Sequence, residues 1–279
     1  MLVFGLGPRK YQVKRDWGRL PSHLSIKSIS AIEVDQHDNV FVLQRSRPFL
    51  LLFTSEGELI DAWDNDYIAD GHYLYVTPED RVIVVDRDFH RLIVFNKEGE
   101  VIDVIGERHI PGLPGEPFNH PTDMVMTRNG HYYVTDGYGN SCVHHFDPSW
   151  KRLNTWGERG SENGAFSTPH AIATDSYGRL LVTDRENNRI QFFNQDGNYL
   201  KEIGNVYHPM DIWIDKEGLI YVTDQTPSIN MFSPEGEWIG RCRTFGIYGH
   251  GITVDSKGDI YIAEMFPDGI TKLVLNHLG

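Results

Sequence analysis

Three histidines occupy the same position in three copies of a recurring sequence pattern. His72, His170 and His250 each begin a short apolar segment, and 98 and 80 residues separate them along the chain. A neutral imidazole is a common ligand of Zn²⁺, and three imidazoles leave one coordination position open for a water or a substrate oxygen. If the fold brings them together, these residues predict a metal centre, most simply for Zn²⁺, although another divalent transition metal would suit the same ligands.

The histidines belong to a repeat that occurs six times. Each copy has an apolar segment, a polar turn with glycine, a second segment that often ends in Val-Thr-Asp, and then further apolar segments. The copies begin near residues 30, 72, 122, 170, 210 and 250. Alternating segments separated by such turns are typical of antiparallel strands. A period of about 40 residues with four strands indicates a β-propeller.

We therefore expect residues 1–279 to form a single all-β domain, a six-bladed β-propeller. The copy that begins near residue 250 lacks its fourth strand. The segment 11–20 resembles the fourth strands of other copies. We expect this N-terminal strand to complete the last blade and close the ring, because an unpaired edge strand needs covering.

The ring explains why the three histidines are so far apart in sequence. The first strand of each copy is expected to lie next to the central axis, and histidine begins it in blades two, four and six. These blades lie about 120° apart in a six-bladed ring, so their imidazoles should converge on one point. The other three copies begin with Ser30, Thr122 and Met210.

The loops after the second strands should open on the same face as the histidines. Arg45, Arg87 and Arg185 stand directly after the second strand in their copies, and Tyr138 stands one position further in its own. A tyrosine and arginines beside a metal predict an anion-binding site with an acid–base group. For Arg87 we favour a structural ion pair with a carboxylate of a neighbouring blade.

Composition limits the partners. There are 26 Lys and Arg residues against 39 Asp and Glu, a net charge of −13, and no basic run offsets it, which argues against nucleic-acid binding. No apolar run is long enough for a membrane span, and the N-terminus lacks the pattern of a signal peptide. The two cysteines, Cys142 and Cys242, cannot form a disulfide framework. We expect a cytoplasmic protein that binds neither nucleic acid nor membrane; its oligomeric state stays open.

At these residues the chain resembles the peptidyl-α-hydroxyglycine α-amidating lyase family, six-bladed propellers of the NHL-repeat type. The segments FNHPTD, VTDGYGNS, TWGERGSENGAFSTPHAIA and VTDRENNRIQFF carry the resemblance, all between residues 118 and 193. The resemblance implies that His72, His170 and His250 bind zinc. It also implies that Tyr138 is a catalytic base, and that Arg185 and Arg45 are active-site arginines.

One departure concerns a second metal. In that family a histidine–aspartate pair at the third ligand also helps to hold a structural Ca²⁺. Here Gly251 follows His250, which puts Ca²⁺ in doubt.

The resemblance implies a zinc-dependent lyase with a small-molecule amide or hydroxy-acid substrate. It would cleave the C–N bond of a carbinolamide, such as an N-acyl or ureido α-hydroxyglycine, to an amide and glyoxylate or a related carbonyl product. Two other classes stay open. One is a zinc-dependent hydrolase or another small-molecule lyase on the same three histidines, and the other is a non-catalytic NHL propeller that binds a partner.

Overall fold

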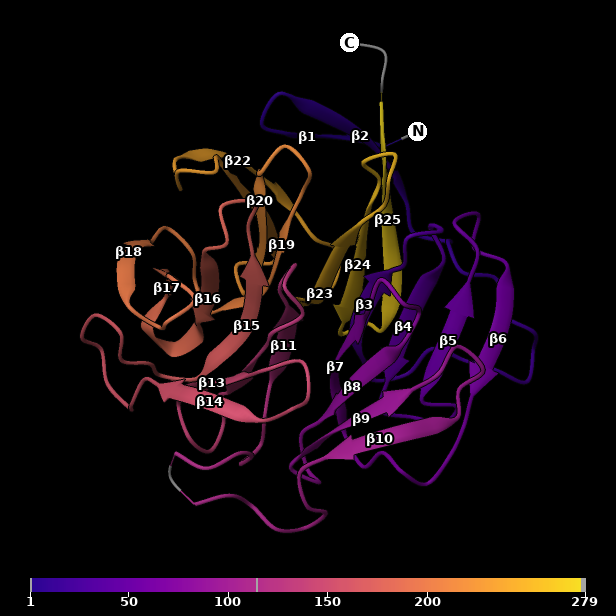
Figure 1. The fold of residues 1–279 in the computed structure, drawn as a ribbon. Coiled ribbons are helices and arrows are strands. Elements are labelled where there is room, and N and C mark those ends of the chain that lie inside the picture. The colour runs from indigo at the N-terminus through magenta and orange to yellow at the C-terminus, as the bar shows by residue number, and fades with distance from the viewer. Residues whose placement is uncertain (1, 114, 277–279) are drawn as a thin grey trace.

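The computed structural model describes residues 2–113 and 115–276. These residues form six antiparallel sheets that follow one another around a central axis (Figure 1). The first strand of each sheet lies beside the first strands of the two neighbouring sheets, so six strands line the axis. The predicted all-β, six-bladed propeller is confirmed.

Each blade is a four-stranded meander, extended in blade six. Blade one comprises β3 (Ile29–Val34), β4 (Val40–Gln44), β5 (Leu50–Phe53) and β6 (Leu59–Trp63), and blade two comprises β7 (Gly71–Val76), β8 (Val82–Asp86), β9 (Arg91–Phe95) and β10 (Val101–Ile105). Blade three comprises β11 (Asp123–Met126), β12 (Tyr132–Asp136), β13 (Cys142–Phe146) and β14 (Arg152–Trp156), and blade four comprises β15 (Pro169–Thr174), β16 (Leu180–Asp184), β17 (Arg189–Phe193) and β18 (Tyr199–Ile203). Blade five comprises β19 (Pro209–Ile214), β20 (Ile220–Asp224), β21 (Ser228–Phe232) and β22 (Trp238–Arg243), and blade six comprises β23 (Tyr248–Val254), β24 (Ile260–Met265), β25 (Gly269–Leu275), β2 (Arg9–Lys14) and β1 (Val3–Leu6).

The hydrophobic core lies between adjacent blades. The second strands β4, β8, β12, β16 and β20 are buried at every residue, because a neighbouring blade covers each of their faces. Side chains of blades one and two, such as Phe41, Trp63 and Phe95, share one such cluster. The outermost strands, such as β18, alternate between half-buried and exposed residues. Burial therefore fixes the inner strands most firmly, and these strands carry the candidate site.

The polar turns that join first and second strands lie at the end of each blade away from the three histidines. In blade four, Asp175 Oδ1 accepts hydrogen bonds from the main-chain N–H groups of Tyr177 and Arg179, at 2.9 Å each. Gly178 follows Tyr177 with a φ of +76°, a conformation that glycine adopts without strain. This turn chemistry explains why the Asp-x-x-Gly pattern recurs along the sequence.

The N-terminal segment closes the ring, as predicted. β2 pairs antiparallel with β25, from Tyr11 opposite Leu275 to Lys14 opposite Lys272. The closing strand covers Arg9–Lys14, so the expected segment 11–20 was placed too far along the chain. Its later part contributes Trp17, whose Nε1 donates to the carbonyl of Ser55 at 3.0 Å and fastens blade six to blade one.

Two elements were not expected from the sequence. β1 forms a hairpin with β2 and adds a fifth strand to blade six; Figure 1 shows both in indigo beside the yellow β25. A single turn of 3₁₀ helix, η1 (Arg185–Asn187), follows β16. In the part of the chain that the structure describes, no helix has the length and apolar character to cross a membrane.

Candidate metal centre

The fold brings the three predicted ligands together. His72 lies on β7, His170 on β15 and His250 on β23, the innermost strands of blades two, four and six. Their ring centroids are 4.9, 5.0 and 5.2 Å apart, and all three side chains are buried. One ring nitrogen from each lies within 4.8 Å of the others. The three imidazoles therefore form a group that could hold a metal ion.

Main-chain carbonyls fix the orientation of each ring. The Nδ1 atoms of His72, His170 and His250 lie 2.6 Å from the carbonyl oxygens of Thr122, Met210 and Ser30, respectively. In the next blade around the ring, Thr122, Met210 and Ser30 occupy the position that the histidines occupy in their own blades. Because a carbonyl can only accept, each Nδ1 carries the proton and donates it. The lone pair is then on Nε2, and this arrangement is common for histidines that bind metals.

The surroundings keep these imidazoles neutral. Burial is the main cause that lowers the pKa of all three, to about 3 for His250 and well below the ordinary range for His72 and His170. Neighbouring imidazoles and the arginines Arg45 and Arg185 lower the pKa values further by charge repulsion. A neutral imidazole is the form that binds a metal.

Tyr138 lies next to two of the histidines. Its hydroxyl oxygen is 3.0 Å from Nε2 of His72 and 3.1 Å from Nε2 of His170. The phenol has one proton, so it can donate to only one of these two lone pairs. A cation between the three Nε2 atoms would satisfy the remaining lone pairs. The donor set thus fits a divalent transition metal with the phenol beside it.

Arg185 connects to Tyr138 from the neighbouring blade. It begins η1, directly after β16, and its Nη1 donates to the hydroxyl oxygen of Tyr138 at 3.3 Å. The guanidinium carbon also lies 5.3 Å from the centre of the Tyr138 ring. Its Nε pairs with Glu186 at 2.8 Å. The charge of Arg185 is therefore held close to both the phenol and the imidazoles.

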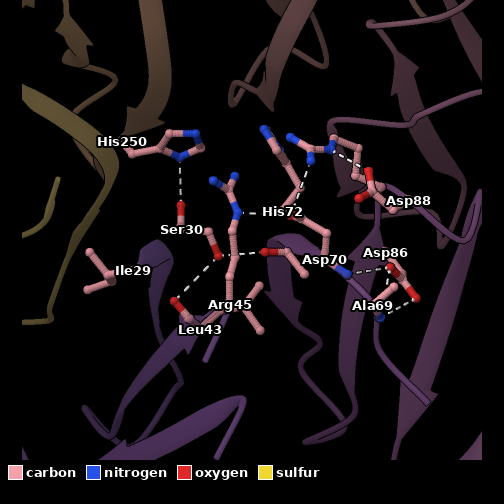
Figure 2. A network of polar contacts seen from close by, with 12 residues as sticks. Ile29, Ser30, Leu43, Arg45, Ala69, Asp70, His72, Asp86, Asp88 and His250 are labelled. Carbon is pink, nitrogen blue, oxygen red and sulfur yellow. Dashed lines mark hydrogen bonds and ion pairs between the residues drawn. The ribbon is translucent and has the colours of Figure 1, made fainter. Parts of the chain in front are cut away.

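Arg45 approaches the site from blade one. Figure 2 shows Arg45 grouped with Asp70, His72 and His250. Arg45 Nε is 2.8 Å from Asp70 Oδ1, and Asp70 Oδ2 accepts a hydrogen bond of 2.8 Å from Arg87. Asp70 thus links two arginines, and burial raises the pKa of its carboxyl group while both arginines oppose that rise.

Sequence reasoning missed Asp70. It correctly predicted an ion pair for Arg87 but wrongly expected the partner in a neighbouring blade, whereas both partners belong to blade two or to the loop before it. Arg87 pairs with Asp70 and Asp88, and its guanidinium carbon lies 5.6 Å from the centre of the Tyr138 ring. Asp70 stands two residues before His72. Its place in the repeat could have identified it. Blade two alone has an acidic residue two positions before the residue that corresponds to His72.

Gly251 is the residue that would have to be an aspartate for the structural Ca²⁺ site of the resembled family. A Cβ atom at this position would lie 3.1 Å from Cα of Ala31 and from the main-chain nitrogen of Ile32. β23 therefore packs too closely against β3 to accept a longer side chain without a shift. The residue after His250 offers no carboxylate, so the ligand expected for a calcium ion in the resembled family is missing here.

Comparison with known proteins agrees with this geometry. The NHL repeat model matches residues 118–146 and 166–193, which include Tyr138 and His170. The chain is an NHL-repeat protein with a six-bladed propeller fold. It is related to the peptidyl-glycine alpha-amidating monooxygenases: the A form of Xenopus laevis is 34% identical over 192 residues, 61% of this chain.

Two further relatives define how far the similarity extends. The probable peptidyl-alpha-hydroxyglycine alpha-amidating lyase of Caenorhabditis elegans is 27% identical over 192 residues, 61% of this chain and 54% of the relative. NHL repeat-containing protein 3 of Homo sapiens is 25% identical over 293 residues, 95% of this chain and 84% of the relative. The NHL-repeat chain spans only about a fifth of the Xenopus monooxygenase.

Solved structures share the fold. A streptogramin B lyase superposes with a TM-score of 0.69 at 15% identity, over 95% of this chain and 98% of the other. A putative gluconolactonase superposes with a TM-score of 0.74, also at 15% identity, over 97% of this chain and 94% of the other. At this identity the likeness concerns the propeller and not the reaction.

Proposed function

We propose that the NHL-repeat protein is a metal-dependent carbon–nitrogen lyase. Its substrate would be a carbinolamide, an N-acyl or ureido α-hydroxyglycine, and its products an amide and glyoxylate or a related carbonyl compound. The observation that carries the proposal is the position of Tyr138, whose hydroxyl lies within 3.1 Å of the Nε2 atoms of His72 and His170, two of the three proposed ligands, and 3.3 Å from Arg185. An acid–base group is thus in reach of the point where a substrate oxygen would bind. The relationship to the amidating monooxygenases and to the C. elegans lyase supports this reaction class.

When bound, a divalent metal would supply Lewis acidity toward the substrate hydroxyl oxygen. Tyr138 acts as the phenolate, having lost its own proton to solvent, and accepts the proton of that hydroxyl group. The carbon–oxygen bond becomes a carbonyl as the carbon–nitrogen bond breaks, and the electron pair of that bond moves to the nitrogen. Tyr138 then returns its proton to the nitrogen and releases a neutral amide. The reaction consumes no water and needs no oxidant or reductant.

The arginines stabilise the negative charges in this sequence. Arg185 and Arg87 lie over the Tyr138 ring, where their positive charges stabilise the phenolate before it accepts the substrate proton. Arg185 and Arg45 approach the metal centre from two different blades, and a guanidinium can bind a carboxylate with two parallel hydrogen bonds. We therefore assign substrate carboxylate binding to these two residues. Asp70 keeps the Arg45 guanidinium in place.

The experiment that tests the proposal measures products. Purified protein, loaded with Zn²⁺ and then with excess metal removed, is incubated with α-hydroxyhippurate, and benzamide and glyoxylate are quantified. The proposal predicts equal amounts of both products, their loss on chelation and their recovery with added Zn²⁺. A metal-loaded protein that forms neither product from any α-hydroxy amide in a panel would refute it. Benzoate that contains oxygen from ¹⁸O-labelled water, formed in place of benzamide, would instead indicate a hydrolase.

A further inference from the structure

A second group of metal-ligating side chains lies in blade three. Asp136 ends β12, and Cys142 and His144 lie on the adjacent strand β13. All three are buried, and one ligand atom from each lies within 4.8 Å of the others. Nε2 of His144 is 3.1 Å from Asp136 Oδ2 and 3.6 Å from Cys142 Sγ. None of these residues belongs to the three-histidine group.

These distances match the edges of a tetrahedral zinc site. With Zn–S of about 2.3 Å and Zn–N or Zn–O of about 2.0 Å, tetrahedral angles place sulfur about 3.5 Å from nitrogen, and nitrogen about 3.3 Å from oxygen. Nδ1 of His144 lies 2.8 Å from the hydroxyl oxygen of Thr155. A hydrogen bond donated from Nδ1 to that hydroxyl would leave the Nε2 lone pair for a metal, as in many histidine ligands.

The other blades show what is unusual here. In blade four, the corresponding aspartate Asp184 accepts hydrogen bonds from Arg189 at 2.8 Å and from Gln191 at 3.2 Å. In blade five, Asp224 accepts hydrogen bonds from a serine and an asparagine at the same two positions, Ser228 and Asn230. Blade three has a thiol and an imidazole in those places, and a thiol is a weak donor. The buried aspartate that meets a guanidinium in blade four therefore meets two groups in blade three that can both bind zinc, a thiol and an imidazole.

We propose that Asp136, Cys142 and His144 bind a thiophilic divalent cation such as Zn²⁺, at a site separate from the three histidines. Asp136 and Cys142 pair across the two strands and enclose the loop 137–141, which carries Tyr138. A cation bound there would join the two ends of this loop and hold Tyr138 in position. On binding, the Cys142 thiol loses its proton to solvent and the sulfur donates an electron pair to the metal.

Cobalt(II) substitution tests the site directly. Metal is removed with a chelator, Co²⁺ is added in the presence of a non-thiol reductant, and bound cobalt and the near-ultraviolet spectrum are measured. The site predicts a sulfur-to-cobalt charge-transfer band, which a site of three imidazoles cannot produce. Burial raises the pKa of the Cys142 thiol, so a metal-free protein should show no thiolate signal in its place. Two cobalt ions per chain are expected if both sites bind.

The variants separate the two sites. Cys142→Ser should lose the charge-transfer band and one cobalt ion per chain. Cys242→Ser is the matched control and should keep both, because Cys242 is buried in an apolar cluster between blades five and six. His170→Ala should keep the band. The band therefore tests the blade-three site even if the three histidines bind nothing and the proposed function fails.

A double variant shows whether loss of the band could result from misfolding instead of loss of the ligands. Cys142→Arg combined with His144→Gln reproduces the residues that blade four has at these positions, Arg189 and Gln191. It should fold, as judged by its circular dichroism and thermal transition, and it should lack the band. The inference is overturned if the folded wild-type protein shows no sulfur-to-cobalt band, or if the band survives in Cys142→Ser or in the double variant.

Discussion

Nδ1 of His250 lies 2.6 Å from the carbonyl oxygen of Ser30, and this hydrogen bond joins the last blade of the propeller to the first. The same contact recurs from blade two to blade three and from blade four to blade five. Each ligand is thus oriented by a strand of the next blade. The ring that holds the protein together also directs all three Nε2 atoms toward one point.

Removal of one imidazole should abolish metal binding at this point. In His170→Ala, two imidazoles remain, and two ligands hold zinc much more weakly than three. We expect one metal ion fewer per chain than in the wild type, and loss of lyase activity with it. Elemental analysis of the purified variant measures the bound metal, and the glyoxylate assay measures the lyase activity. His37→Ala, in an exposed turn at the other end of blade one, is the control and should change neither. Unchanged metal content in His170→Ala would show that the metal is bound elsewhere.

Loss of the Tyr138 hydroxyl should impair catalysis without loss of metal. In Tyr138→Phe the three ligands are untouched, and we expect kcat to fall about 100-fold or more, the usual effect of removing a positioned acid–base group. Steady-state kinetics on the preferred substrate measures kcat, and elemental analysis measures the metal content. Tyr177→Phe removes an exposed phenol at the opposite end of blade four and should retain full activity. If Tyr138→Phe retains the wild-type kcat, the proposed base is wrong and a metal-dependent hydrolase becomes the better account.

Arg185→Ala should chiefly weaken the binding of carboxylated substrates. A charge-assisted hydrogen bond contributes about 1.5–3 kcal/mol, so we expect KM to rise about tenfold or more for an α-hydroxyglycine substrate. The KM of an analogue without the carboxylate should change little. Arg45→Ala should show the same selectivity if both arginines bind the carboxylate, and Arg81→Ala, in an exposed turn, should not. Equal losses on both substrates would mean that Arg185 acts only through Tyr138.

The repeat frame and the three ligands could be predicted from the sequence, because burial forces the inner strands into register and histidine recurs at one position in that register. The partners of Arg45 could not. Asp70 lies in a loop before β7, and only the packed ring brings it to Arg45 of the preceding blade. The blade-three group had a visible signal, since Cys142 and His144 replace the arginine and glutamine of blade four. In blade three, the resemblance to the lyase family implies a role only for Tyr138, in the loop between Asp136 and Cys142.

The buried imidazoles should make the metal-free protein sensitive to acid. The pKa of an unfolded histidine is about 6.5, whereas burial lowers the pKa of His250 in the folded protein to about 3. Between these values the unfolded chain binds more protons, so the free energy of unfolding falls as the pH decreases. Denaturant titrations in chelator between about pH 7 and about pH 4 measure this slope. In His250→Gln, which can still donate to Ser30, the slope should be smaller, and an equal slope would contradict the assignment.

The most direct test of the central claim is a single titration. Metal-free protein receives increasing Zn²⁺, and the rate of glyoxylate release from α-hydroxyhippurate is followed in parallel for the wild type and for Cys142→Ser, which lacks the proposed second site. Activity in Cys142→Ser should rise linearly and reach its plateau at one zinc ion per chain, at a rate below that of the wild type because the second cation no longer holds Tyr138 in position. His170→Ala should stay inactive throughout. Glyoxylate release that does not depend on zinc, or that persists in His170→Ala, would contradict the account.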